Sequence, residues 1–270
     1  MAALQVRWWA NSEISVSEKI RYTMSLLTKT LFGNGVDLYS HQFQSDNQLA
    51  LLLLPDYVGL VQPVRDLMPP RSRSGNHFHV LDIGGNVGQF ATAAARFMGA
   101  HIISYEPNPA CWPFLSTNSL GYKNWNFIKR AVSETEQEIE LYFVQGKSAQ
   151  GSFSRANSTT NLLSSEGHRS VLVQSGPVRI EDLQNAGCEV SHFDLVKIDV
   201  EGYELEALKG LTQITFDFLF VEIAEDRDHG FCSADVIETA LKVLGIQIEE
   251  IYSDKPASGA EPRNVLFKKL

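Results

Sequence analysis

Short apolar runs alternate with longer segments of mixed apolar and polar residues from residue 78 onward. The short runs are typical of buried strands, whereas the mixed segments have apolar positions at helical spacing. Strands are predicted at 78–83, 101–106, 127–132, 138–144, 172–178, 194–199 and 216–223, and helices at 87–98, 109–120, 179–186, 203–209 and 233–244. Because strands that alternate with helices build parallel sheets, the pattern predicts an α/β fold.

The chain ends with two further strand-like segments, 246–252 and 264–268, which are joined by a short polar region containing Pro256 and Gly259. So short a connection suits an antiparallel pair, because parallel strands need a crossover. We therefore predict a mostly parallel seven-stranded sheet with a reversed last strand, in a domain that spans 76–270.

Residues 1–70 differ from this core, because they have helical apolar spacing at 17–32 and 48–68 and no strand–helix alternation. We predict a helical N-terminal segment that is joined to the main domain by a linker rich in Pro, Arg and Ser. A long polar loop is predicted at 146–167, and loops of this length often carry function. The N-terminal segment and the loop are both expected to cover the substrate side of the site.

Three closely spaced glycines follow the first predicted strand. The strand ends near Asp82, and the sequence Gly84-Gly85-Asn86-Val87-Gly88 then leads into a helix. Glycine permits a positive φ and a close approach of the backbone to a ligand, and the new helix offers free N–H groups at its start. Glu106 ends the next strand, 22 residues after Gly84, where it would meet the hydroxyl groups of a ribose. Pro107 and Asn108 then form a tight turn, so these features together predict a nucleotide-cofactor site.

The details favour S-adenosylmethionine over a dinucleotide. A dinucleotide site has the pattern G-x-G-x-x-G, and its pyrophosphate binds at the helix N-terminus. Here Asp82 precedes the turn, where it would repel a pyrophosphate but suit the ammonium group of a methionine moiety; alternatively, it only caps the turn. Arg130 and Ala131 end a later strand where an adenine ring would lie, and their backbone would read the edge of the base.

Four motifs between residues 78 and 223 resemble those of the FkbM family of methyltransferases. They are Val80–Gly88, Tyr105–Pro109, Arg130–Val132 and Leu195–Glu204, of which the last is the most specific. The resemblance implies a Rossmann-like class I fold that binds S-adenosylmethionine, and O-methylation of hydroxyl groups on sugars, polyketides and other natural products. Gly85 stands where the family usually has alanine, and Phe153 interrupts the serine-rich loop of the family.

Acidic residues end several of the predicted strands, where ligands of open α/β sheets bind. They are Asp82, Glu106, Asp199, Glu201 and Glu222. Asp199 and Glu201 are the best catalytic candidates, because they follow the strand beside the cofactor strand and point to one side if that strand continues. An alcohol that accepts a methyl group must lose a proton, so either acid would serve as the base, or the two would share a divalent ion. Asp199 is also expected to contact the cofactor.

Alternatives stay open for these residues. Glu201 would instead cap the helix that begins at Tyr203. His229 would replace the acids as the base, since histidine titrates near neutrality, or it would belong to a solvated charged loop. No histidine joins the two acids in sequence, and we assign no metal ligand.

Charge and composition restrict the partners and the location. The net charge of −9 argues against nucleic acid or an anionic membrane as the main partner, because phosphates need clustered Lys and Arg. Three distant cysteines form neither a metal-ligand spacing nor a disulfide framework, and the apolar run at 49–54 is too short to cross a bilayer. No signal peptide is recognisable at the start. We predict a cytoplasmic protein that binds a small hydroxylated substrate, and a homodimer stays open.

Two other classes of function also stay open. The first is a nicotinamide-dependent oxidoreductase, against which the glycine spacing and the lack of a Tyr-x-x-x-Lys pair argue. The second is a catalytically silent protein of the same fold, against which the acids at the strand ends argue. The hypothesis that we favour is a methyltransferase that uses S-adenosylmethionine.

Overall fold

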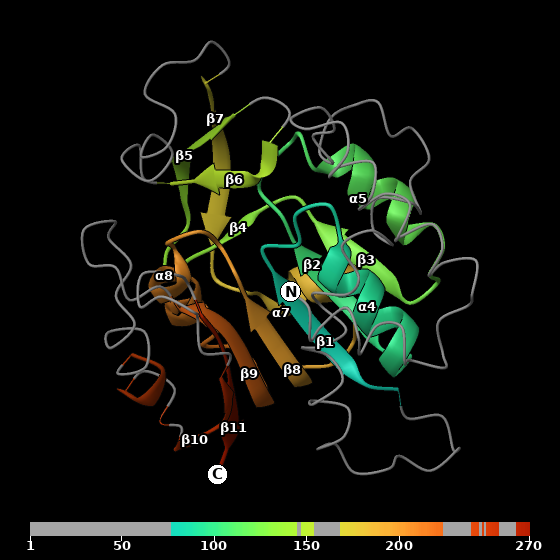
Figure 1. Ribbon diagram of the computed structural model, residues 1–270, viewed down its shortest axis with the longest axis vertical. Coiled ribbons are helices and arrows are strands. Elements are labelled where there is room, and N and C mark those ends of the chain that lie inside the picture. The colour runs from blue at the N-terminus through green and yellow to red at the C-terminus, as the bar shows by residue number, and fades with distance from the viewer. Residues whose placement is uncertain are drawn as a thin grey trace, which may run out of the picture.

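The computed structural model describes residues 77–144, 147–153, 168–223, 239–242, 245, 247–253 and 263–270. Two sheets and the helices that pack on them make up this part of the chain (Figure 1). The predicted N-terminal segment, His229 and most of the predicted helix at 233–244 lie outside the described residues, as does the larger part of the predicted polar loop.

The central sheet has seven strands in the order β10-β11-β9-β8-β1-β2-β3. The strands are β1 (His79–Ile83), β2 (His101–Tyr105), β3 (Trp125–Ile128), β8 (His192–Ile198), β9 (Thr215–Ile223), β10 (Ile248–Ser253) and β11 (Arg263–Lys269). The first five of these strands pair in parallel, whereas β11 is antiparallel to both β9 and β10. This order, with its reversed last strand, is the Rossmann-like class I methyltransferase arrangement, so the predicted fold class is confirmed.

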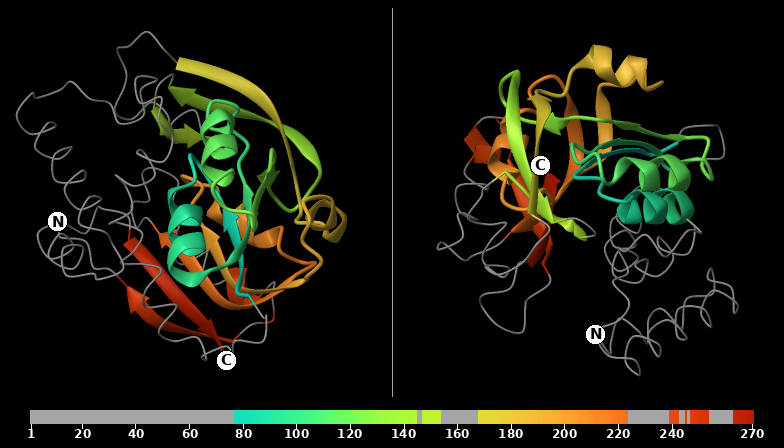
Figure 2. Two further views of the ribbon diagram at one scale, coloured as in Figure 1. Left: turned by 90° about the vertical axis from the view of Figure 1, so that its right-hand side faces the viewer. Right: turned by 90° about the horizontal axis from the view of Figure 1, so that it is seen from above.

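Helices cover both faces of this sheet (Figure 2). Two of them, α4 (Gln89–Met98) and α5 (Trp112–Ser119), lie side by side on one face. The other face carries α7 (Ile180–Asn185) and α8 (Glu204–Lys209), whose buried residues pack in a separate apolar cluster. None of the helices in the described part of the chain has the length and apolar character that a bilayer crossing requires.

The apolar residues of the strands divide between these two faces. On β1, Val80 packs in the cluster that contains α4, whereas Leu81 packs in the cluster that contains α8. The same division separates Ile102 from Ile103 on β2. Because neighbouring side chains of a strand point to opposite faces, continuous apolar runs are what a sheet with two covered faces requires.

The second sheet has four strands in the order β4-β7-β5-β6 and lies above the central sheet in Figure 1. Its strands are β4 (Ala131–Val132), β5 (Gln137–Val144), β6 (Lys147–Ser152) and β7 (His168–Gly176).

This sheet corrects two predictions. The predicted strand at 127–132 is wrong, because the chain turns at Arg130 and its two ends join different sheets: β3 in the central sheet and β4 in the second. The predicted polar loop is wrong at its start, where β6 pairs with β5. Polar residues adopt this strand because the neighbouring strand satisfies their backbone, which local propensity does not reveal.

Two glycines with positive φ flank α4 and offer a matched test of the packing. A Cβ on Gly88 would lie 2.3 Å from the Trp125 ring, whereas a Cβ on Gly99 would meet nothing within 4 Å. Gly99→Ala should cost about 1 kcal/mol of unfolding free energy, for its left-handed backbone alone. Gly88→Ala should cost about 1–3 kcal/mol more, because it also overpacks the core. Urea denaturation measures both, and equal costs would contradict the packing at Gly88.

Candidate functional site

A cavity opens at the carboxyl ends of the central strands. It is lined by the turn after β1, by residues that follow β2 and β8, and by Glu222 near the end of β9. Its empty volume, including the open mouth, is ≈ 990 Å³. Ligands of open α/β sheets bind at this edge, so the cavity is the candidate active site.

The turn after β1 is held by the neighbouring strand ends. The N–H groups of Gly84 and Gly85 both donate to the carbonyl oxygen of Tyr105, at 3.0 Å. A Cβ on Gly84, whose φ is +83°, would lie 1.8 Å from the carbonyl oxygen of Asp199. Gly84 is therefore required by the close approach of the backbone after β8, and not only by the space for a ligand that the sequence suggests.

Glu106 faces the same cavity from the end of β2. One carboxylate oxygen accepts the N–H of Asn86 and the other accepts the N–H of Asn108, both at 2.7 Å. Burial raises the pKa of Glu106 to about 7, although both hydrogen bonds lower it. The turn after β1 and the turn after β2 are thus joined through one carboxylate, and Pro107 lies beside it on the wall.

Asn108 lines this wall with an unused donor. Its side-chain oxygen accepts the N–H of Ala110, but its buried Nδ2 has no hydrogen-bond partner among the described residues. A buried donor without a partner is costly in a folded protein. A ligand with hydroxyl or nitrogen acceptors beside Glu106 would satisfy this group, and a ribose–adenine moiety has both.

Asp82 lies beneath the turn and not on the cavity wall. It is completely buried, accepts a hydrogen bond from the Ser104 hydroxyl at 3.0 Å, and forms an ion pair with Lys197 at 3.3 Å. Burial raises the pKa of Asp82, and Lys197 opposes this effect. The expected contact of Asp82 with a ligand ammonium group stays a prediction.

Arg130 and Ala131 both line the cavity. The guanidinium group of Arg130 is engaged in the protein: it pairs with Asp182 of α7 at 3.0 Å and with Glu136. It therefore ties the turn between β3 and β4 to α7. The expected contact of the Arg130 and Ala131 backbone with the edge of an adenine ring stays a prediction.

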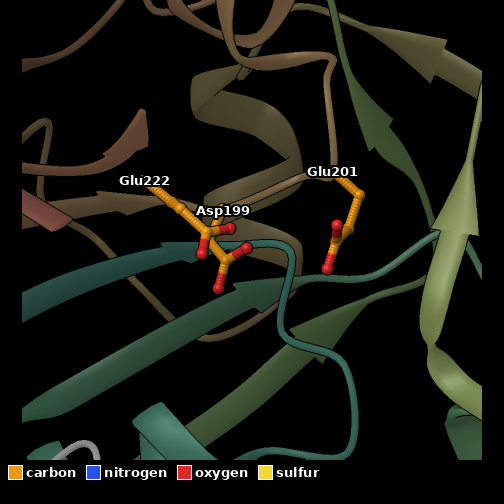
Figure 3. A group of neighbouring side chains, drawn as sticks. All are labelled: Asp199, Glu201 and Glu222. Atoms are coloured by element: carbon orange, nitrogen blue, oxygen red, sulfur yellow. The ribbon is translucent and has the colours of Figure 1, made fainter. Parts of the chain in front are cut away.

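Asp199, Glu201 and Glu222 bring carboxylate oxygens within 4.8 Å of one another (Figure 3). In the figure, Asp199 and Glu222 lie against each other, and Glu201 approaches from the other side. The two predicted acids are therefore close, but not for the predicted reason. β8 ends at Ile198, and Glu201 has a φ of 54°, so a turn and not strand alternation brings them together.

The crowding of these three acids perturbs their protonation. Burial, with Asp199 and Glu201 nearby, raises the pKa of Glu222 to about 10. Burial, with Asp199 and Glu204 nearby, raises the pKa of Glu201 to about 8, although part of its surface is open to the cavity. The Glu222 carboxyl group therefore holds a proton at neutral pH and donates it in a hydrogen bond to Asp199, whereas Glu201, which is exposed, is shifted in the same direction. The charged partner of Asp199 is Lys197, at 3.3 Å.

A buried acid, Glu204, holds the turn that leads into α8. One oxygen of Glu204 accepts the N–H of Gly202 at 3.0 Å and the N–H of Val200 at 3.3 Å. These are N–H groups of the turn that leads into α8. Glu204 is the first residue of α8 and thus fixes the turn before the helix. The N-cap residue, Tyr203, makes no side-chain cap hydrogen bond, and capping of α8 by Glu201 stays a prediction.

Two aromatic side chains complete the cavity wall. The rings of Phe153 and Tyr203 have centroids 4.6 Å apart and planes inclined at 52°. Phe153 follows β6, and Tyr203 precedes α8. An aromatic wall beside carboxyl groups suits a molecule with an apolar face and hydroxyl groups.

The Methyltransferase FkbM domain model matches residues 82–248 of the chain. The chain belongs to the FkbM methyltransferase family. The match covers the turn after β1, Glu106, the three clustered acids and the central strands up to the start of β10. The family is named for methyltransferase activity.

Known proteins similar to this chain include the hexuronic acid methyltransferase AglP of Haloferax volcanii. The two are 33% identical over 148 residues, which are 53% of this chain and 54% of AglP, so the match spans about half the length of the relative.

Solved structures with a similar fold have low sequence identity to this chain. A TehB-like SAM-dependent methyltransferase from Corynebacterium glutamicum is 12% identical, with a TM-score of 0.41 over 95% of this chain and 100% of that chain. A precorrin-6y C5,15-methyltransferase from Geobacter metallireducens is 12% identical, with a TM-score of 0.44 over 79% of this chain and 87% of that chain. With TM-scores this low, the fold class rests on the strand order and not on these likenesses.

The sequence analysis missed several residues that line the cavity. Lys197, Phe153 and Tyr203 all line the cavity, although none is among the predicted site residues. Lys197 had a signal, because it is the charged residue within the apolar run Leu195–Ile198. The position of His229 relative to the cavity is untested, since that residue lies outside the described part of the chain.

The raised pKa values of Glu201 and Glu222 predict how stability depends on pH. Each group has a folded-state pKa above its ordinary value of 4.5, so the stability that it contributes is complete below about pH 4.5. That stability is lost as the pH rises toward about 8 for Glu201 and toward about 10 for Glu222. Thermal unfolding without ligands should therefore shift to lower temperature between pH 5 and pH 9.

The variant Glu222→Gln should weaken this dependence of stability on pH, because a glutamine side chain does not ionise. We expect it to exceed the parent at pH 9 by at least about 1 kcal/mol, or about 2–4 °C in Tm. Exposed Glu138→Gln is the matched control and should follow the parent at both pH values. A Glu222→Gln profile parallel to that of the parent would show that Glu222 is ionised throughout.

Proposed function

We propose that the protein is an O-methyltransferase that uses S-adenosylmethionine to methylate a hydroxyl group of a small metabolite, sugar or other natural product. One observation carries the proposal: a single cavity is lined both by Glu106 and Asn108 and by the acids Asp199, Glu201 and Glu222. The first set suits a nucleoside, and the second suits a hydroxyl group that must lose its proton.

The residues present fit the cofactor. Bound S-adenosylmethionine would supply an electrophilic methyl group on a sulfonium ion. Glu106 would accept the ribose hydroxyls, the unused Nδ2 of Asn108 would donate to the nucleoside, and the backbone of Ala131 would meet the adenine edge. Gly85 and Asn86 would contact the methionine part, and Asp82 would support the turn from below.

Two contributions of the protein to methyl transfer follow from this arrangement. The cavity holds donor and acceptor in line, and such alignment is worth about 7–11 kcal/mol in favourable cases. Asp199 receives the proton of the acceptor hydroxyl, because Lys197 holds it as a carboxylate on the cavity wall and the neighbouring Glu222 already carries a proton. The acceptor is held against Phe153 and Tyr203, whose rings suit the apolar face of a sugar or polyketide.

The relative from Haloferax volcanii supports a sugar-like acceptor, because its name assigns it a hexuronic acid. A divalent ion among the three acids is an alternative way to lower the pKa of the hydroxyl group.

Cofactor identity is tested by calorimetric titration of the parent with S-adenosylhomocysteine and with NAD. We expect binding of the first alone, and Glu106→Ala should weaken it by about 1.5–3 kcal/mol, the usual range for hydrogen bonds to a charged group. Glu138→Ala, at an exposed position outside the cavity, should bind as the parent does. Binding of NAD without binding of S-adenosylhomocysteine would reject the proposed cofactor.

The role of Asp199 is tested by Asp199→Asn, which keeps the shape of the side chain and removes the charge. Turnover on a panel of glycosides and polyketide alcohols should fall by about 10²–10⁴, the usual worth of acid–base catalysis, while affinity for S-adenosylhomocysteine changes much less. Asp217→Asn, the same change at an exposed position on β9, is the control.

A chelator separates the two chemical roles of Asp199. Activity that is lost with chelator and restored by Mg²⁺ indicates a metal ligand, whereas unchanged activity indicates a direct base. If Asp199→Asn turns over like the parent, the proton leaves by another route, and His229 is the next residue to change.

A further inference from the structure

Lys197 is a buried cation at the centre of the site. Only 2% of its side chain is exposed, and its ammonium group lies 5.8 Å from the centre of the Phe90 ring of α4. Three oxygen atoms surround it: a carboxylate oxygen of Asp82 at 3.3 Å, one of Asp199 at 3.3 Å, and the carbonyl oxygen of Gly84 at 2.8 Å. A buried charge persists only where such partners compensate for lost water.

The strand register places the Lys197 ammonium group between the turn after β1 and the acid cluster after β8. Lys197 of β8 lies directly opposite Asp82 of β1, which lies opposite Ser104 of β2. The Gly84 carbonyl belongs to the turn after β1, and Asp199 belongs to the acid cluster after β8. One ammonium group therefore contacts both the cofactor side and the acceptor side of the cavity.

We propose that Lys197 is a positioning residue that couples the two sides: its ammonium group fixes the Gly84 carbonyl of the cofactor turn and the Asp199 carboxylate at the same time. This inference rests on the proposed function, since it assigns the turn to the cofactor and Asp199 to the acceptor. Lys197 lies beneath both and acts through them, so it is not itself a catalytic residue.

A purely structural explanation competes with this role. Lys197 is also the counter-ion of the fully buried Asp82, and loss of that ion pair would leave an unpaired buried carboxylate. Such a loss is strongly destabilising whatever the function. The single variant Lys197→Met therefore cannot separate the two explanations, and the comparison has to be made where Asp82 carries no charge.

The test compares Asp82→Asn with the double variant Asp82→Asn/Lys197→Met. Both lack the Asp82 charge, so the polar contacts in which they differ are those of Lys197 with the Gly84 carbonyl and the Asp199 carboxylate. We expect similar Tm values, an affinity for S-adenosylhomocysteine at least tenfold weaker in the double variant by calorimetry, and a kcat at least tenfold lower on the best neutral methyl glycoside acceptor. Equal affinity and equal kcat in the two variants would overturn the coupling role and leave Lys197 only as the counter-ion of Asp82.

A second double variant, Asp82→Asn/Lys197→Gln, separates the two contacts and guards against misfolding of the methionine variant. Glutamine keeps a donor for the Gly84 carbonyl but has no charge for Asp199. We expect its KM for S-adenosylmethionine to return close to that of Asp82→Asn, while its kcat stays low. A kcat equal to that of Asp82→Asn would overturn the contact with Asp199 as the functional one.

The outcomes also separate this inference from the proposed function. A parent protein that binds no S-adenosylhomocysteine would contradict the proposed function. A parent that binds it, together with variants that match Asp82→Asn in affinity and kcat, would contradict only the coupling through Lys197.

Discussion

The ion pair between Asp82 and Lys197 is the constraint on which the site depends. It joins two neighbouring parallel strands inside the protein, where water cannot screen the charges. A single buried carboxylate or ammonium would be costly, so each residue requires the other. The pair extends to Ser104, whose hydroxyl also accepts the indole N–H of Trp125, so a polar row crosses the sheet from β8 to β3.

This polar row is surrounded by apolar packing on the same face. Phe90 of α4 lies over the Lys197 ammonium and stacks on Phe220 of β9, with ring centres 6.3 Å apart. The low-polarity surroundings strengthen each charge–charge contact and hold the side chains in one arrangement. A buried network of this kind fixes the turn after β1 relative to the exit from β8, and residues of both segments line the cavity.

The cavity therefore combines two different environments. Around Glu106, backbone N–H groups bind the carboxylate and hold its position. Around Asp199, three acids crowd together, and the raised pKa values of Glu201 and Glu222 leave the negative charge beside Lys197. Glu201 reaches this cluster only from a left-handed backbone conformation, which is uncommon for a residue with a side chain and is typical of functional sites.

Periodicity and spacing in the sequence determined the α/β class, the reversed last strand, and the positions of the glycine turn, Glu106 and Asp199, because each depends on residues close together in the chain. Tertiary structure alone decided the pairing of Lys197 with Asp82, 115 positions away, and the need for glycine at Gly84, which comes from the Asp199 backbone. It also decided the break at Arg130 and the strand β6, where side-chain partners and a neighbouring strand outweigh local preference. Contacts between distant segments have no local pattern, and they fix the chemistry of this site.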